Sequence, residues 1–209
     1  MSKKRSKKRR EERVYCRYIK RMLDILLSGI LLLFLMLPIL IICVIIRLDS
    51  SGAAIFKQVR LGRRGVPFVC YKFRTMYIYA PTNMSATFEG RYRYITRVGK
   101  FLRRSSLDEI PQLFNVFKGD MSLVGPRPLI SDEKKVHEGR MSKGVYSLRP
   151  GITGMAQISG RNLIGDEEKL KKDTYYLKNV KIWLDMKIIL KTIAKVFKGE
   201  GIDKEEVNR

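Results

Sequence analysis

The sequence predicts an α/β protein that is mostly helical and carries one small β-hairpin. In this prediction an N-terminal re-entrant membrane helix precedes a compact cytoplasmic domain with amphipathic interfacial helices. Three observations lead to it: an apolar run behind a basic segment, two short β-rich segments, and later stretches whose apolar residues recur at helical spacing. The 209 residues, 45% of them hydrophobic, are enough for one packed domain with appendages. A formal net charge of +23 indicates negatively charged partners.

A step in composition near the N-terminus marks the membrane element. Residues 1–21 contain eleven Lys or Arg residues, whereas residues 22–46 contain one charge, Asp24. We expect residues 1–13 to form a disordered basic tail near anionic lipids. Residues 25–46 would reach about 33 Å as a straight helix, against roughly 30 Å of hydrocarbon. Length alone therefore permits a simple span.

Pro38 and the flanking charges favour a re-entrant helix over that span. A proline inside a helix removes a main-chain hydrogen bond, so we expect a helix-break-helix over residues 14–48. Basic residues dominate on both sides of the apolar run, and basic flanks prefer the cytoplasm. Both ends then lie on one side of the membrane. A proline-kinked span is the alternative, because such helices do cross membranes.

The cytoplasmic domain is expected over residues 49–202, with a short tail at 203–209. Residues 53–60 and 66–73 are rich in Ile, Val, Phe and Tyr and are separated by glycines. This pattern predicts a β-hairpin. Residues 77–90 are polar and aperiodic, which predicts a loop.

Helical periodicity returns three times in the second half of the chain. It predicts helices over residues 99–118, 166–177 and 182–197. In the last of these, lysines alternate with an apolar stripe, so the helix can lie in the membrane interface with Trp183 near the headgroups. An ordinary surface helix packed on the core has the same periodicity.

Several chemistries lose support from the residues that are present. Cys16, Cys43 and Cys70 are isolated and form no C-x-x-C, which indicates a reduced cytosolic setting. His137 is the single histidine and cannot build a His/Cys zinc site. Neither G-x-x-x-x-G-K-[ST] nor G-x-G-x-x-G occurs, so kinase and dinucleotide-binding folds are disfavoured.

Two adjacent carboxylates, Asp108 and Glu109, follow a pair of arginines. Ser106 and Glu109 fit a capping box, so a structural interpretation is open, although Pro111 would remove a bond from a helix begun there. In the functional interpretation the helix N-terminus, Arg103 and Arg104 bind phosphate. The carboxylates would then supply a nucleophile and an oxygen ligand for Mg²⁺.

Arg127 lies between Pro126 and Pro128, which restrict the backbone on both sides of it. The arginine is thus carried on a stiff segment, though a plain loop with a surface arginine fits the same residues. Arg149 and Arg161 occur in Gly-bounded turns and offer further cations.

Together these motifs resemble the monotopic phosphoglycosyl transferases, also called bacterial sugar transferases. The matching segments are YKFRTM (71–76), ITRVGKFLRRSSLDEIPQLFNVFKGDMSLVGPRPL (95–129), RPGITG with AQISGRN (149–162) and WLDMKIILKTIAKVF (183–197). The resemblance covers nearly everything from Val14 onward. Several motifs in the right order make it specific.

The resemblance implies a catalytic domain that transfers a sugar-1-phosphate from a UDP-sugar to a polyprenol (undecaprenyl) phosphate, releasing UMP. It also implies a Mg²⁺ requirement and a monotopic location at the cytoplasmic face of the bacterial inner membrane. The family's Asp-Glu pair makes Asp108 the nucleophile of a covalent phosphosugar intermediate and Glu109 its partner in metal binding or proton handling. Both are therefore predicted as catalytic residues and metal ligands. The predicted substrate-binding cations are Arg103, Arg127, Arg149, Arg161, Lys72 and Arg74.

The expected partners are the UDP-sugar, the polyprenol phosphate and anionic lipids, with a homodimer left open and nucleic acid excluded. The rival from another class is a non-catalytic, membrane-tethered polybasic protein that binds nucleic acid or anionic lipid. A non-catalytic assembly factor is a third alternative. The acidic pair and its accompanying arginines favour the enzyme.

Overall fold

The computed structural model describes four segments of the chain, residues 15–81, 93–130, 133–160 and 164–198. Several predicted features lie outside these described residues: the basic tail 1–13, most of the loop 77–90, Arg161 and the tail 203–209.

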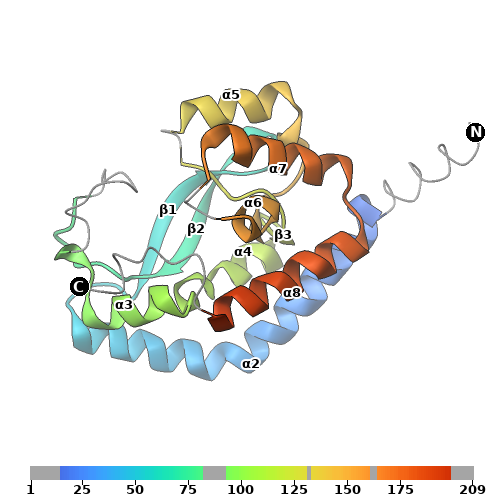
Figure 1. The fold of residues 1–209 in the computed structure, drawn as a ribbon. Helices are drawn as coiled ribbons and strands as arrows, with labels where there is room; N and C mark the ends of the chain where they lie inside the picture. The colour runs from blue at the N-terminus through green and yellow to red at the C-terminus, as the bar shows by residue number, and fades with distance from the viewer. Residues whose placement is uncertain (1–14, 82–92, 131–132, 161–163, 199–209) are drawn as a thin grey trace, which may run out of the picture.

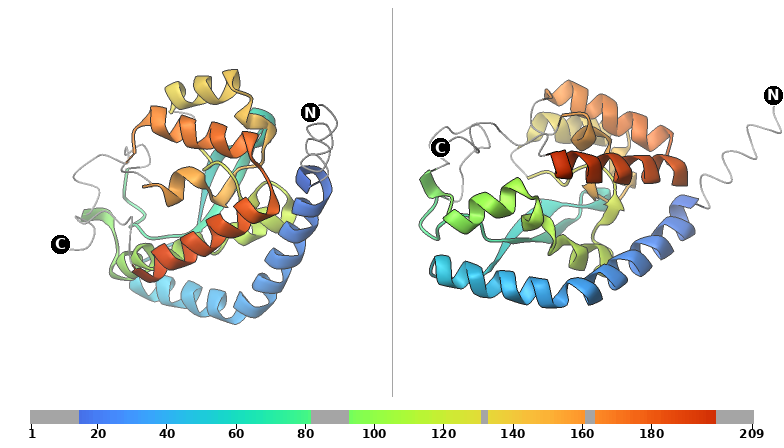
Figure 2. Two further views of the ribbon diagram at one scale, coloured as in Figure 1. Left: turned by 45° about the vertical axis from the view of Figure 1, so that its right-hand side comes forward. Right: turned by 60° about the horizontal axis from the view of Figure 1, so that its bottom comes forward.

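The predicted membrane segment is one long helix. A π-helical turn, η1 (Tyr15–Ile19), leads into α2 (Lys20–Asp49), whose 30 residues extend about 45 Å. α2 bends along its length but continues through Pro38 without the predicted break (Figures 1 and 2). A proline costs a helix one hydrogen bond and commonly bends it without ending it. Within the described part of the chain, α2 alone is long and apolar enough to cross a membrane.

α2 exposes most of its apolar side chains. Leu33, Phe34 and Leu37 are 70%, 75% and 66% exposed, whereas only Asp24, Ser28 and Ile46 are buried. A contiguous exposed apolar surface of this kind marks a contact with membrane or protein. The helix is therefore compatible with a membrane anchor.

The first turns of α2 are fixed to the folded domain by polar contacts. The Arg21 guanidinium donates to the carbonyls of Val116 and Phe117, at 2.6 and 2.9 Å. The Asp24 carboxylate accepts a hydrogen bond of 3.0 Å from the Leu123 amide. The single charge of the apolar run is thus a docking group, which explains its burial.

The predicted hairpin is confirmed. β1 (Ile55–Leu61) and β2 (Pro67–Phe73) pair antiparallel, with Ile55 opposite Phe73. The turn η2 (Arg63–Gly65) connects them.

The single helix predicted over residues 99–118 is instead three short elements. They are α3 (Arg97–Arg104), the 3₁₀ turn η4 (Leu107–Glu109) and α4 (Gln112–Lys118). Ser106 has a φ of 56°, which interrupts the right-handed path, and Pro111 stands at the N-cap of α4, where its missing N–H costs nothing. The Ser106 side chain makes no capping hydrogen bond, so the capping-box interpretation is wrong.

Two three-residue strands join distant motifs. β3 (Ser122–Val124) pairs in parallel with β4 (Gly151–Thr153). Strands this short show no alternation in sequence and were not predicted.

The remaining helices pack on one another and on the small sheet (Figure 1). They are α5 (Lys134–Ser142), α6 (Met155–Ile158), α7 (Asp166–Lys178) and α8 (Ile182–Lys198), with the 3₁₀ turn η5 (Val145–Ser147) after α5. α8 contacts both β3 and β4, and α7 packs against α5 and α6. α7 and α8 lie where the sequence predicted helices. α8 packs on the core through Leu184 and Ile188, while Trp183, Leu190 and Phe197 face outward. The helix thus has a core-facing stripe and a second, exposed apolar stripe.

Candidate active site

A pocket forms where the hairpin meets the segments around the acidic pair and the Pro-Arg-Pro motif. The pocket is partly open to solvent. Its polar lining comes from six elements or loops: Arg60, Lys72, Glu109, Gln112, Arg127 and Gln157. Three of these, Lys72, Glu109 and Arg127, were predicted from sequence, and the fold brings them together.

The acidic pair lies on the 3₁₀ turn η4, and of the two residues Glu109 lines the pocket while Asp108 does not. Glu109 accepts a hydrogen bond of 2.8 Å from the Lys72 ammonium, and both side chains are about four-fifths buried. Asp108 precedes it on the same turn and is partly exposed. Successive side chains of a 3₁₀ turn point about a third of a turn apart, so the two carboxylates face different directions. One can serve the pocket's cations while the other meets an incoming group.

Two guanidinium groups share the pocket. Arg60 donates to the Gln58 side-chain oxygen at 3.1 and 2.6 Å and to the Pro128 carbonyl at 3.2 Å. Burial lowers the pKa of Arg60, and the positive charge of Arg127 lowers it further. Two like charges held together in a buried site favour the binding of an anion between them.

Arg60 was missed by sequence reasoning, although strand geometry contains a signal for it. Gln58 pairs with Cys70 across the hairpin, so residues 58 and 60 share a sheet face with residues 70 and 72. Assigning Lys72 to a site therefore implicates Arg60.

Arg74, Arg103 and Arg149 were also predicted to bind substrate, and they lie elsewhere. Arg103 donates to the Thr75 hydroxyl at 2.9 Å, and Arg149 donates to the Gly119 carbonyl at 2.9 Å. Neither lines the pocket. Their contact with substrate stays a prediction.

Arg74 caps the end of α2. Its guanidinium, in a residue only 8% exposed, donates to the Ser50 carbonyl at 2.7 Å and to the Ser51 carbonyl. A cation at a helix C-terminus satisfies free carbonyls and complements the helix dipole. Arg74 thus joins the hairpin to α2, a role that residue type alone does not reveal.

Metal binding at the acidic pair would depend on the substrate. Among the described residues, no group of three or more His, Cys, Asp or Glu side chains is placed to hold a metal ion. Mg²⁺ commonly takes one or two protein carboxylates and completes its shell with water and substrate phosphates. One carboxylate of the Asp108-Glu109 pair would be enough for a site of this kind.

Comparison with known proteins assigns the chain to a family. The family model described as bacterial sugar transferase matches residues 15–199. The chain belongs to this family. The resemblance to bacterial sugar transferases seen in the motifs is thus confirmed. All residues that line the pocket lie within the matched region.

Three relatives illustrate the range of this bacterial sugar transferase's similarity. The uncharacterized sugar transferase EpsL of Bacillus subtilis is 41% identical, over 88% of this chain and 90% of the relative. The undecaprenyl-phosphate galactose phosphotransferase of Salmonella typhimurium is 38% identical, over 88% of this chain but 42% of its own length. The UDP-glucose:undecaprenyl-phosphate glucose-1-phosphate transferase of Caulobacter vibrioides is 38% identical, over 85% and 69%. The chain therefore spans less than half of the Salmonella relative and most of the other two.

Proposed function

We propose that this bacterial sugar transferase transfers a sugar-1-phosphate from a UDP-sugar to undecaprenyl phosphate and releases UMP. The observation that carries the proposal is the pocket in which Arg60, Lys72 and Arg127 accompany Glu109, with Asp108 next to it on the turn η4. Cations in a partly buried pocket suit a diphosphate, and an adjacent carboxylate suits attack on phosphorus. The name of the Caulobacter relative supports both the UDP-sugar donor and the undecaprenyl-phosphate acceptor, and the name of the Salmonella relative supports the same acceptor.

The proposed chemistry has two balanced steps. A carboxylate oxygen of Asp108 attacks the phosphorus that bears the sugar, the bond from that phosphorus to the UMP oxygen breaks, and UMP leaves. A phosphate oxygen of the polyprenol then attacks the same phosphorus and releases the Asp108 carboxylate. Arg127, Arg60 and Lys72 hold the phosphates and stabilise charge that develops on them. Mg²⁺ bound by the acidic pair would supply further charge neutralisation.

Release of UMP from a donor panel tests this function. We expect the purified protein to release UMP from at least one of UDP-galactose, UDP-glucose and their 2-acetamido counterparts. Repeated turnover should require undecaprenyl phosphate, whereas without this acceptor at most one UMP per protein molecule should be released. Chelation of Mg²⁺ should abolish the release. No UMP from any donor, together with salt-dependent binding to duplex DNA, would instead favour the polybasic binding protein.

We also propose that α2 is re-entrant and that the pocket faces the cytoplasm. The two ends of α2 support this arrangement, because both contact the same folded domain. Arg21 near the start binds the Val116 carbonyl, and Ile46 near the end packs with Phe73 and Leu102. A straight span would place those ends on opposite sides of the bilayer.

Accessibility of introduced cysteines tests the topology. In a background with the three natural cysteines replaced by alanine, Ser2→Cys and Asn208→Cys should both resist a membrane-impermeant maleimide in intact spheroplasts. Both should react after lysis. Labelling of one position alone in intact spheroplasts would establish a span.

A further inference from the structure

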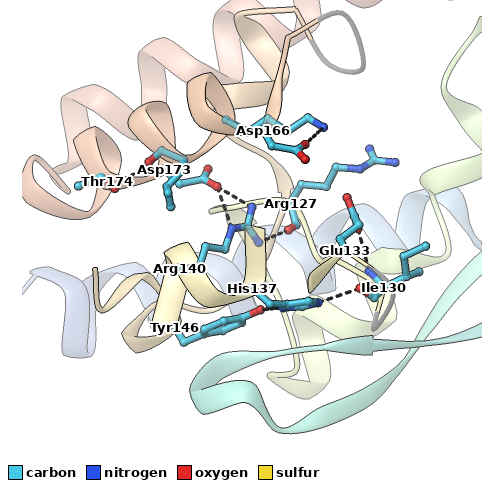
Figure 3. Close-up of polar contacts among 11 residues, drawn as sticks. Arg127, Ile130, Glu133, His137, Arg140, Tyr146, Asp166, Asp173 and Thr174 are labelled. Atoms are coloured by element: carbon cyan, nitrogen blue, oxygen red, sulfur yellow. Dashed lines mark hydrogen bonds and ion pairs between the residues drawn. The ribbon is translucent and has the colours of Figure 1, made fainter. Parts of the chain in front are cut away.

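The Pro-Arg-Pro segment is held through its carbonyl groups. All five carbonyls from residue 126 to residue 130 accept a hydrogen bond. The donors, in chain order, are the Gly151 amide (2.9 Å), Arg140 Nη1 (2.8 Å), Arg60 Nη1 (3.2 Å), the Leu61 amide (3.2 Å) and His137 Nε2 (2.8 Å). Two of these donors, Arg140 and His137, come from α5. This helix therefore binds the segment before Pro128, at the Arg127 carbonyl, and after it, at the Ile130 carbonyl (Figure 3).

Arg140 is itself fixed by a buried ion pair. Its Nε and Nη2 atoms both donate to Asp173 Oδ2 on α7, at 3.0 and 2.5 Å. The two side chains are only 4% and 1% exposed. Figure 3 shows the Arg140 guanidinium between the Asp173 carboxylate and the Arg127 carbonyl. A buried guanidinium with this carboxylate partner has little freedom to leave the Arg127 carbonyl.

The position of Arg127 needs such a restraint. Its side chain shares the pocket with Arg60, so the two positive charges repel each other when no anion is bound. The prolines fix their own φ angles, but the direction of the Arg127 peptide depends on what its carbonyl binds. Without that bond, the arginine can relax outward toward water.

We infer that Arg140, held by Asp173, is a positioning residue that keeps the Arg127 guanidinium in the pocket for a diphosphate ligand. This inference rests on the proposed function, because it takes Arg127 to contact phosphate. It adds a role for two residues on α5 and α7, because neither Arg140 nor Asp173 lines the pocket.

A double-mutant cycle on UDP binding tests the positioning role. UDP has no sugar to transfer, so its dissociation constant is measurable in variants without turnover. We expect Arg127→Ala and Arg140→Gln each to weaken UDP binding about tenfold or more. In the Arg127→Ala background, Arg140→Gln should cost less than about threefold, because the side chain that it positions is absent. An equal loss in both backgrounds would overturn the inference in favour of a general structural role.

A matched variant separates positioning from loss of an ion pair as such. Lys20 and Asp185 form another largely buried pair, at 2.6 Å and 13% and 7% exposure, at the start of α2. Lys20→Gln should leave UDP binding unchanged in either background. If Arg140→Gln does not fold, Asp173→Asn replaces it in the same cycle with the same two outcomes. If Arg127→Ala does not weaken UDP binding, the proposed function itself is contradicted. If Arg140→Gln costs the same in both backgrounds, only the positioning role is contradicted and the proposed function stands.

Discussion

Asp108→Asn is expected to abolish turnover while the protein stays folded. The carboxamide keeps the shape of the side chain but cannot act as an anionic nucleophile, so release of UMP should fall by at least about 10³-fold. Asp108 is partly exposed on a 3₁₀ turn, so the substitution leaves no buried cavity. UMP release and the thermal unfolding midpoint, measured on the same preparation, check both halves of the expectation.

The control is a carboxamide substitution on an exposed surface. Glu168 on α7 is 51% exposed and forms only a loose pair with Lys172 at 3.8 Å, so Glu168→Gln should leave turnover and stability near those of the original chain. A donor labelled in its sugar phosphate should also leave label on the protein when the acceptor is omitted, and Asp108→Asn should remove that label. Near-normal turnover in Asp108→Asn would exclude the aspartate as nucleophile. If the original chain is active but takes up no label without the acceptor, the sugar phosphate is transferred directly from donor to acceptor.

The sequence was sufficient for elements with a sustained period. The hairpin and α7 and α8 follow from alternation and from helical spacing. The break between α3 and α4 was not predicted, because apolar spacing continues across it and a left-handed serine at position 106 has no mark in the sequence. β3 and β4 escaped prediction because their pairing is a long-range event between two three-residue segments.

The candidate site shows a similar division. Motif residues Lys72, Glu109 and Arg127 could be named from the sequence, but only the fold brings them to one pocket. Arg74 has the same chemistry as the pocket cations and neighbours one of them, yet its guanidinium caps α2. Whether an arginine meets a ligand or a helix end depends on contacts distant in sequence, which residue type does not encode.

Gly151 and Gly154 are required because their backbone lies very close to that of Gly125. A Cβ built on Gly154 would lie 2.0 Å from the Gly125 carbonyl oxygen, and one on Gly151 would lie 2.1 Å from the Gly125 nitrogen. The φ of Gly154 is −171°, an angle that any residue adopts, so close backbone approach and not conformational freedom requires glycine there. These glycines let β4 and the residue after it pack directly against Gly125, which immediately precedes the Pro-Arg-Pro segment.

Gly154→Ala is therefore expected to separate β4 from that segment. We expect it to lower the free energy of unfolding by about 3 kcal/mol or more and to weaken UDP binding, because backbone atoms cannot yield as a flexible side chain does. Gly165→Ala is the matched control: both glycines are N-cap residues, at α6 and α7, without a side-chain cap. Gly165 has a φ of −66° and nothing within 4 Å of the added carbon. The lower entropy of the unfolded alanine chain and the poorer capping by alanine oppose each other, so this substitution should change stability by less than about 1 kcal/mol. Denaturant unfolding of the two variants measures the contrast. Equal stabilities would mean that the approach of β4 to Gly125 does not hold the Pro-Arg-Pro segment in place.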